Sequence, residues 1–311
     1  MATIHTLAIR TVKYCVKYLK FAITALFVAV ATVFLSAPAI YMQSFLDGVT
    51  VWAYNVLPAL FPFAVLTTLA IKFFPRGKFS LCQTAFGVRA DGIYLVSLLC
   101  GYPMGAKAIA ESPYEKDVAT QICSFCSSAS PIFVVATVGV KLLANTAATL
   151  VLVVSHLLST LLNGFLYKKK RANVLRTQIV DNFNSADIGN TVTSAVLSVL
   201  SVGGLIALFY MLTDIIKSFL PGAIAESAAV GFALGLFEMT NGIISVCGTC
   251  NLLTATVLSS FLLAFGGMCV FAQSLAFLAK KNVNPLSLLK MKLTQGSIAT
   301  LLSFALGSLF I

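Results

Sequence analysis

Charged side chains are scarce in this chain. Asp, Glu, Lys and Arg make up 10% of the 311 residues, whereas a soluble domain carries roughly 25%. The mean hydropathy is +0.96, and 59% of the residues are apolar. These values exclude an ordinary soluble domain and predict an all-α polytopic membrane protein.

Acidic residues are rarer than basic ones, 10 against 21, which gives a net charge of +11. In a soluble domain such an excess would suggest nucleic-acid binding. Here the cations lie between apolar runs, where they orient a membrane protein. We therefore expect a lipid bilayer as the surroundings and no nucleic-acid partner.

Catalytic and metal-binding patterns are missing as well. The sequence has no GxxxxGK[ST] loop, no HExxH and no GxSxG, so neither an ATP-driven pump within this chain nor an enzyme is expected. A membrane hydrolase of lipid-linked phosphates is the enzymatic alternative, but the two histidines lie near no acidic residue. Two CxxC pairs, Cys123/Cys126 and Cys247/Cys250, are interpreted as small buried thiols, and no cofactor or metal is expected.

Long apolar runs are abundant. The first, from Phe21 to about Ile40, follows four cations. It is longer than the roughly 7 to 15 residues of a signal-peptide core, so we predict an uncleaved N-terminal anchor helix. Eight further runs follow, at 49–74, 92–110, 118–141, 146–167, 191–219, 226–247, 252–279 and 286–311.

The positions of Lys and Arg constrain the topology. If all eight runs crossed the membrane, the basic loop after residue 74 and the basic loop 168–176 would lie on opposite sides, against the positive-inside rule. Both become cytoplasmic if 92–117 enters and leaves on one side as a re-entrant hairpin. A second hairpin at 226–250 then makes four more cations cytoplasmic, namely Lys280, Lys281, Lys290 and Lys292.

The two halves of the chain then have opposite topology with the same order of elements. We predict two inverted-topology repeats, each with a re-entrant helical hairpin and a broken transmembrane helix, with the N-terminus cytoplasmic and Ile311 external. The predicted units are 1–48 (basic segment and anchor), 49–171 (first repeat), 172–190 (cytoplasmic linker) and 191–311 (second, inverted repeat).

Interruptions of the apolar runs mark a candidate site. The segment GYPMGAK places Gly101, Pro103, Gly105 and Lys107 inside an apolar run. Non-helical backbone at membrane depth is tolerated only where it is buried or lines a cavity, and broken helices in inverted repeats are typical of secondary transporters. We therefore predict a hairpin tip at a substrate site. The alternative is a kinked spanning helix whose Lys107 reaches the interface.

Five spaced motifs resemble those of the YlbJ family of sporulation integral membrane proteins. They are VLPALFPFAVL (56–66), GYPMGAK (101–107), SSASPIFVVATVG (127–139), FEMTNGI (237–243) and AFGGMCVFAQ (264–273). This family carries paired nucleoside-recognition Gate domains and is similar to the concentrative nucleoside transporters. The resemblance implies a transporter core of two hairpins and two broken helices. It also implies a bacterial membrane protein that moves dipicolinic acid across the outer forespore membrane.

The interruptions and the resemblance together define the candidate substrate-binding residues. Lys107 is expected to meet an anion, or else to pair with Glu111. The serines before Pro131 suit a broken helix whose second half offers N-terminal amides to a carboxylate, although small-residue packing is the alternative. Members of the family tend to have two Asn where this chain has Ser127 and Ser128. The set is Gly101, Tyr102, Pro103, Gly105, Lys107, Ser127, Ser128, Ser130, Glu238, Thr240, Asn241, Gly266 and Gly267.

Glu238 allows two interpretations. A carboxylate that faces an anion would bind it together with a proton, which predicts proton symport, or Glu238 ties the hairpin tip to backbone amides. The expected substrate is a small organic anion, dipicolinate, and a nucleoside or another uncharged ring compound is the competing class. A structural protein of spore formation is the non-transport alternative. The sequence leaves open the coupling ion, H+ or Na+, and the formation of a homo-oligomer.

Overall fold

The computed structural model describes residues 21, 24–25, 27–72, 80–169 and 186–311, and all regular structure in these ranges is helical. The all-α prediction is therefore confirmed for this part of the chain. The helices that build the molecule are α2 (Pro38–Val51), η1 (Trp52–Val56), α3 (Leu57–Lys72), α4 (Leu81–Phe86), α5 (Asp91–Cys100), α6 (Met104–Glu111), α7 (Lys116–Cys123), η2 (Phe133–Leu143), α8 (Thr146–Leu166), α9 (Ala186–Ser218), α10 (Gly222–Ala225), α11 (Ala228–Gly235), α12 (Met239–Thr249), α13 (Leu252–Phe265), α14 (Gly267–Leu278), η3 (Ala279–Lys281) and α15 (Pro285–Phe310).

Four helical segments of the described chain are long and apolar enough to cross a membrane. They are Thr146–Leu166, Val192–Ser218, Leu252–Lys281 and Pro285–Phe310, with mean hydropathies between 1.4 and 2.3. A helix rises 1.5 Å per residue, so about 20 residues span the roughly 30 Å hydrocarbon core. The molecule is thus a polytopic membrane protein, as its composition predicted.

The predicted anchor helix over 21–40 is wrong in its extent. The helix Phe27–Ser36 ends at Ser36, and the next helical segment, Pro38–Val56, leaves at an angle of 108° after the bend at Ala37. The cause is local, since Ala37 has non-helical dihedrals (φ −145°, ψ 62°) and precedes a proline, which disfavours the helical conformation of the residue before it. The two segments count as one span only if the bent pair is taken together.

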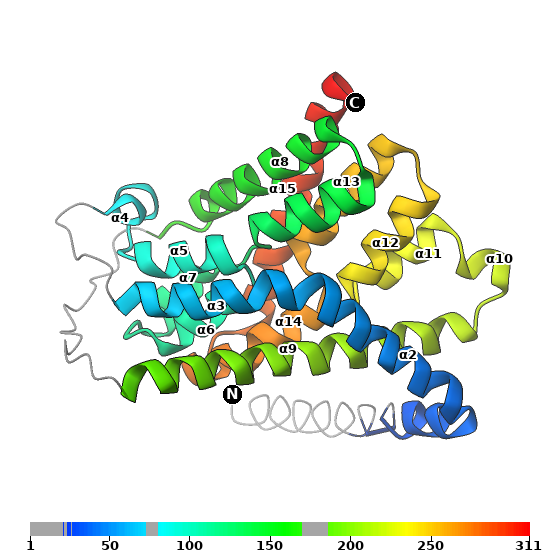
Figure 1. Ribbon diagram of the computed structural model, residues 1–311. Coiled ribbons are helices and arrows are strands. Elements are labelled where there is room, and N and C mark those ends of the chain that lie inside the picture. The colour runs from blue at the N-terminus through cyan, green and yellow to red at the C-terminus, as the bar shows by residue number, and fades with distance from the viewer. Residues whose placement is uncertain (1–20, 22–23, 26, 73–79, 170–185) are drawn as a thin grey trace, which may run out of the picture.

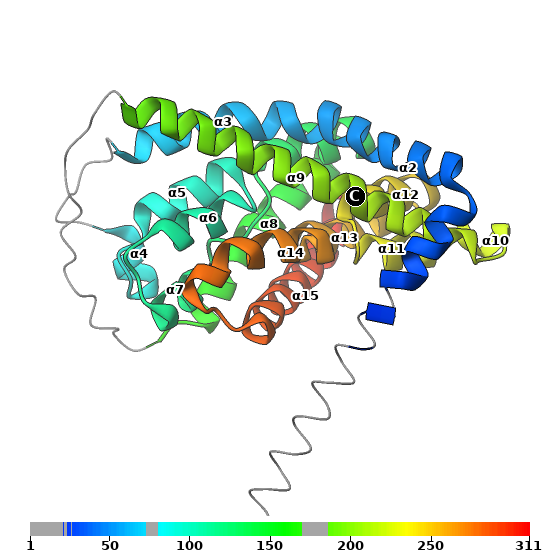
Figure 2. The same cartoon turned by 90° about the horizontal axis from the view of Figure 1, so that it is seen from below.

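The helices form two groups around the interrupted segments. Helices α8, α13 and α15 pack against one another, while α2 and α3 pack along α9. Figure 1 shows α5, α6 and α7 at one end of the molecule and α10, α11 and α12 at the other. Figure 2 shows the same arrangement from below, with α9 running along α2 and α3.

The predicted unit boundaries fall within helices. Helix α2 continues through the boundary at residue 48, and α9 begins at Ala186, inside the predicted linker. The greater part of that linker, 172–185, and the N-terminal basic segment lie outside the described residues.

Candidate functional site

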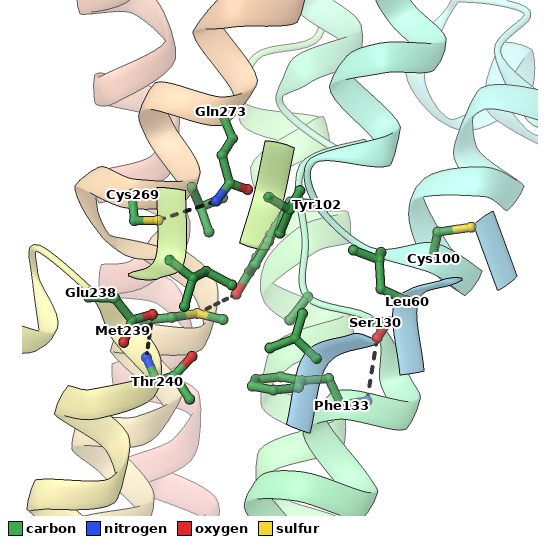
Figure 3. A pocket seen from close by; sticks show the side chains of 15 residues that line it. Leu60, Cys100, Tyr102, Ser130, Phe133, Glu238, Met239, Thr240, Cys269 and Gln273 are labelled. Atoms are coloured by element: carbon green, nitrogen blue, oxygen red, sulfur yellow. Dashed lines mark hydrogen bonds between the residues drawn. The ribbon is translucent and has the colours of Figure 1, made fainter. Parts of the chain in front are cut away.

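Four interruptions of the helical chain meet around one buried pocket (Figure 3). Two are the connections α5–α6 and α11–α12; the third is the non-helical segment between α7 and η2, and the fourth is the junction of α13 and α14. Helix α9 and the η1–α3 region close the remaining wall. The lining residues are Val56, Leu60, Cys100, Tyr102, Ala129, Ser130, Phe133, Val202, Ile206, Glu238, Met239, Thr240, Cys269, Val270 and Gln273.

The tip of the α5–α6 connection lies directly on the segment before Pro131. Gly101 has a positive φ of 74°, and a side chain at this position would collide with the backbone of Ser130. The next residue, Tyr102, donates its backbone N–H to the Ser128 carbonyl at 2.8 Å. Gly105 approaches the carbonyl of Cys126 so closely that a side chain would not fit. Gly101 and Gly105 therefore serve close backbone contact.

Tyr102 connects the first half of the chain with the second. Its hydroxyl lies 2.7 Å from the Met239 sulfur and donates to the Leu263 carbonyl at 3.2 Å. In Figure 3 its ring crosses the pocket toward Met239. The first hairpin tip thus contacts α12 and the end of α13, both from the second half.

Three buried polar side chains hold the non-helical segment at 124–130. Asn163 Nδ2 donates to the Ser124 carbonyl at 2.7 Å, and Lys292 Nζ donates to the Ser127 carbonyl at 2.7 Å. The backbone N–H of Ala129 donates to His156 Nε2 at 3.1 Å. Because no water competes for these groups in hydrocarbon, side chains must satisfy a broken backbone. His156 therefore has a definite partner in the backbone of Ala129.

The predicted serines contribute mainly through their backbone. Ser127 and Ser128 present carbonyls to Lys292 and to Tyr102. The Ser130 hydroxyl accepts the N–H of Phe133 at 3.4 Å, at the start of the helix that follows Pro131. The helix interruption before Pro131 is thus confirmed. The binding of substrate by the hydroxyls of these serines stays a prediction.

Glu238 caps α12 at the second tip. Its two carboxylate oxygens accept the backbone N–H groups of Thr240 at 3.1 Å and Asn241 at 2.7 Å. The residue is 2% exposed. This geometry is that of the second interpretation above, in which the carboxylate ties the tip to backbone amides. An ionised carboxylate suits it, because the oxygens accept from two donors at a helix N-terminus.

The neighbours of Glu238 differ in what they face. The Thr240 hydroxyl lines the pocket, is buried, and has no hydrogen-bond partner among the residues that the structure describes. Asn241 donates from Nδ2 to the Thr213 hydroxyl of α9 at 3.2 Å and does not line this pocket. Thr240 is therefore the stronger candidate for a ligand contact.

The junction of α13 and α14 repeats the pairing of tip and interruption. Gly266 and Gly267 both have positive φ, 84° and 74°. The N–H of Met268 donates to the Leu236 carbonyl at 2.7 Å, and the N–H of Cys269 donates to the Phe237 carbonyl at 2.9 Å. The second hairpin tip therefore rests on the second interruption, as the first tip rests on the first.

Lys107 lies apart from this pocket. Its Nζ donates to the Ser194 carbonyl at 3.1 Å, the Ser194 hydroxyl at 2.7 Å and the Ser198 hydroxyl at 2.9 Å. Among the described residues it forms no ion pair with Glu111. Lys107 lines a second, wider pocket of about 360 Å³ beside Lys280, whereas the first pocket measures about 40 Å³. The structure thus separates Lys107 from the other predicted ligands.

Two residues at or beside the site, Lys292 and Gln273, were not among those predicted from the sequence. Lys292 was counted among the cytoplasmic cations, and that side of the membrane stays a prediction, but the residue lies within α15 with 3% of its surface exposed. The signal was a buried stripe that contains polar side chains at helical spacing, namely Lys292, Gln295, Ala299 and Ser303. Gln273 lines the pocket and donates to the Cys269 sulfur at 3.2 Å.

The described residues contain no group of three or more His, Cys, Asp or Glu side chains placed to hold a metal ion. Cys123 and Cys126 are both buried and unbridged. Cys247 and Cys250 are half-buried and also unbridged.

These features define an all-helical integral membrane protein whose interrupted helices meet at a buried site. The chain is similar to the sporulation integral membrane protein YlbJ of Bacillus subtilis (strain 168), with 27% identity over 331 aligned positions that cover 89% of this chain and 80% of that protein. This similarity confirms the resemblance to the YlbJ family that the five motifs indicated. No protein-family model and no solved structure matches the chain.

Proposed function

We propose that this protein is a secondary transporter of a small organic anion, dipicolinate, in the outer forespore membrane of a sporulating bacterium. The observation that carries the proposal is the meeting of four interruptions at one buried pocket. Transporters of this kind bind substrate near the midplane, where discontinuous helices present freed backbone groups. The relative's name supports a role in sporulation.

The pairing of tips and interruptions supports two inverted repeats. In the first half a tip amide donates to the interruption, from Tyr102 to Ser128, and in the second half interruption amides donate to the tip, from Met268 and Cys269 to Leu236 and Phe237. Both pairs are separated by about 30 residues of sequence. The donor and acceptor roles are reversed between the halves, and what they share is the backbone pairing of a tip with the interruption that follows it.

The buried charges favour an anion. Lys107 and Lys292 are 5% and 3% exposed, and neither forms an ion pair with a carboxylate of the described residues. The one buried carboxylate at the pocket, Glu238, is engaged by backbone amides. Since unpaired ionised groups are costly at membrane depth and mark substrate or ion pathways, the surplus positive charge suits a substrate carboxylate.

A nucleoside or another uncharged ring compound is the second candidate. The pocket itself is lined by no Lys or Arg, so a neutral ring would meet no unsatisfied cation there. The pocket volume of about 40 Å³ admits little more than water, because one water needs about 10 to 15 Å³. Either substrate therefore requires the hairpin tips to separate.

Substrate exchange in proteoliposomes tests the proposal. The purified protein should exchange labelled dipicolinate against internal dipicolinate, and excess nucleoside should not compete. Thr240→Val should weaken exchange about tenfold, because a hydrogen bond to a charged ligand contributes about 1.5–3 kcal/mol. Since the Thr240 hydroxyl has no hydrogen-bond partner in the described part of the chain, this variant should keep its stability.

Thr249→Val is the matched control on the same helix, where the threonine is exposed. It should exchange like the wild type. Exchange of a nucleoside instead of dipicolinate would replace the substrate assignment, and the absence of any exchange would refute transport of either compound.

A further inference from the structure

Lys292 occupies an unusual position for an ionisable side chain. It lies within the spanning helix α15 and is almost fully buried. Its Nζ donates to the Ser127 carbonyl at 2.7 Å and lies 5.3 Å from the centre of the Tyr102 ring. A buried ammonium normally pairs with a carboxylate, but here its partners are a backbone carbonyl and an aromatic face.

The carbonyl of Ser127 is available because the helix is interrupted there. Carbonyls released by unwound helices coordinate the coupling cation in many secondary transporters. The ammonium of Lys292 makes the same kind of contact, so it stands where such a cation would be held. A lysine differs from a metal cation in that it can lose its charge by releasing a proton.

We infer that Lys292 is the ion-coupling residue of this transporter and that its proton replaces a sodium ion at the first helix interruption. This inference rests on the proposed transport function. It names H+ as the coupling ion and moves the coupling role from Glu238, whose oxygens are engaged as a helix cap, to the C-terminal helix.

Among the ionisable groups in its surroundings, Lys292 itself is the one able to change its charge. Helix α13, which packs on α15, has no ionisable side chain, and α8 supplies His156 alone. His156 Nε2 accepts a backbone N–H, which only the neutral ring can do. Helix α7 supplies the buried Cys123, with Lys116 and Asp117 at its exposed start.

Two further groups complete the surroundings. The Tyr102 ring faces Lys292 from the hairpin tip, and Lys290 is exposed two residues before it on the same helix. In the part of the chain that the structure describes, no buried carboxylate therefore faces Lys292 from the helices that pack on α15. The charged form of Lys292 therefore depends on the Ser127 carbonyl at the interruption and on the Tyr102 ring.

The contacts of Lys292 link its proton to the substrate pocket. Ser127 is followed by Ser128, whose carbonyl accepts the N–H of Tyr102. Tyr102 in turn lines the pocket. The charged lysine therefore favours docking of the hairpin tip on the interruption, and substrate acts on the same tip. A substrate that enters while the tips are apart and then holds this tip docked favours the same position as the charged lysine. Two ligands that favour one position of a movable element are coupled thermodynamically, so each binds better when the other is present.

Two readouts in proteoliposomes separate coupling from binding. Exchange of labelled dipicolinate needs no driving force, whereas accumulation needs coupling. The membrane potential is held at zero, and an inside-alkaline gradient of one pH unit is imposed without Na+. For one proton per substrate the wild type should then accumulate dipicolinate up to about tenfold, since a tenfold ratio corresponds to about 1.4 kcal/mol.

Three variants test the assignment. Lys292→Arg keeps a cation for the Ser127 carbonyl but cannot release its proton, so it should exchange dipicolinate and not accumulate it. Lys292→Gln should also fail to accumulate. Lys290→Gln, the exposed control on the same helix, should behave like the wild type in both assays.

Accumulation by Lys292→Arg at the wild-type level would overturn the inference, because a merely structural cation would then suffice. If neither Lys292 variant exchanges dipicolinate, the accumulation assay with the wild type is decisive. Accumulation of dipicolinate driven by the pH gradient alone supports the inference. Accumulation that depends on a Na+ gradient overturns it. A wild type that exchanges no dipicolinate would refute the proposed function and, with it, this inference.

Discussion

Replacing Gly101 with alanine is expected to destabilise the protein strongly. The backbone at Gly101 has φ 74° and ψ −169°, a region that is essentially restricted to glycine and costs about 1–3 kcal/mol for other residues. The new Cβ would also collide with the backbone of Ser130, and overpacking of this kind costs about 1–3 kcal/mol. Together these effects predict a loss of about 2–6 kcal/mol.

The collision cannot be relieved by a rotamer change. Its partner is backbone, and the neighbouring Ala129 is fixed by its hydrogen bond to His156. The Tyr102 N–H to Ser128 bond also joins tip and interruption. The tip would have to move as a unit, so Gly101→Ala should weaken substrate exchange as well.

Gly92→Ala is the matched control, because Gly92 lies on the same helix α5, has no atom within 4 Å of the added methyl group, and has no positive φ. It should change the free energy of unfolding by at most about 1 kcal/mol, in the stabilising direction.

Thermal unfolding in detergent, followed with a thiol-reactive fluorophore, measures the difference. Cys100, Cys123, Cys126 and Cys269 are each at most 2% exposed and should react only as the protein unfolds. At about 2 °C per kcal/mol for a chain of this size, the Tm of Gly101→Ala should fall by about 4–12 °C. Equal Tm values for the two alanine variants would refute the close-contact argument.

Three further predictions concern two charged side chains and the membrane topology. Glu238→Gln leaves one oxygen for two backbone donors, so it should lower the free energy of unfolding by about 1 kcal/mol while the pH dependence of dipicolinate binding stays as in the wild type; a flattened pH response would return the proton to Glu238. Lys107→Ala should slow dipicolinate uptake severalfold, whereas Met104→Leu should not; equal rates would remove Lys107 from the pathway. A reporter fused after Ile311 should be active only outside the cytoplasm, and cytoplasmic activity would contradict the inverted repeats.

Local chemistry in the sequence was enough to find where the helices are interrupted. Gly101, the residues before Pro131, and the Gly266–Gly267 pair all lie at interruptions. Proline removes a backbone donor and glycine permits positive φ, so these residues act on the backbone wherever the chain folds. Composition likewise determined the membrane class, because apolar surface of this extent requires lipid.

Local chemistry also misled at one place and left a choice open at another. The apolar run at 21–40 was continuous in hydropathy, but the dihedrals at Ala37 divide it. Glu238 was assigned a choice between proton carrier and helix cap, and only the positions of the Thr240 and Asn241 amides favour the cap.

The partners of the buried polar side chains were decided by the tertiary structure alone. Lys292 meets Ser127 across 165 positions of sequence, and Lys107 meets Ser194 across 87. No periodicity or motif encodes such pairs, because they form only when α15 and α9 pack against the interrupted segments. The sequence places a lysine in an apolar helix, but the packing of distant helices determines whether that lysine faces lipid, water or a freed carbonyl.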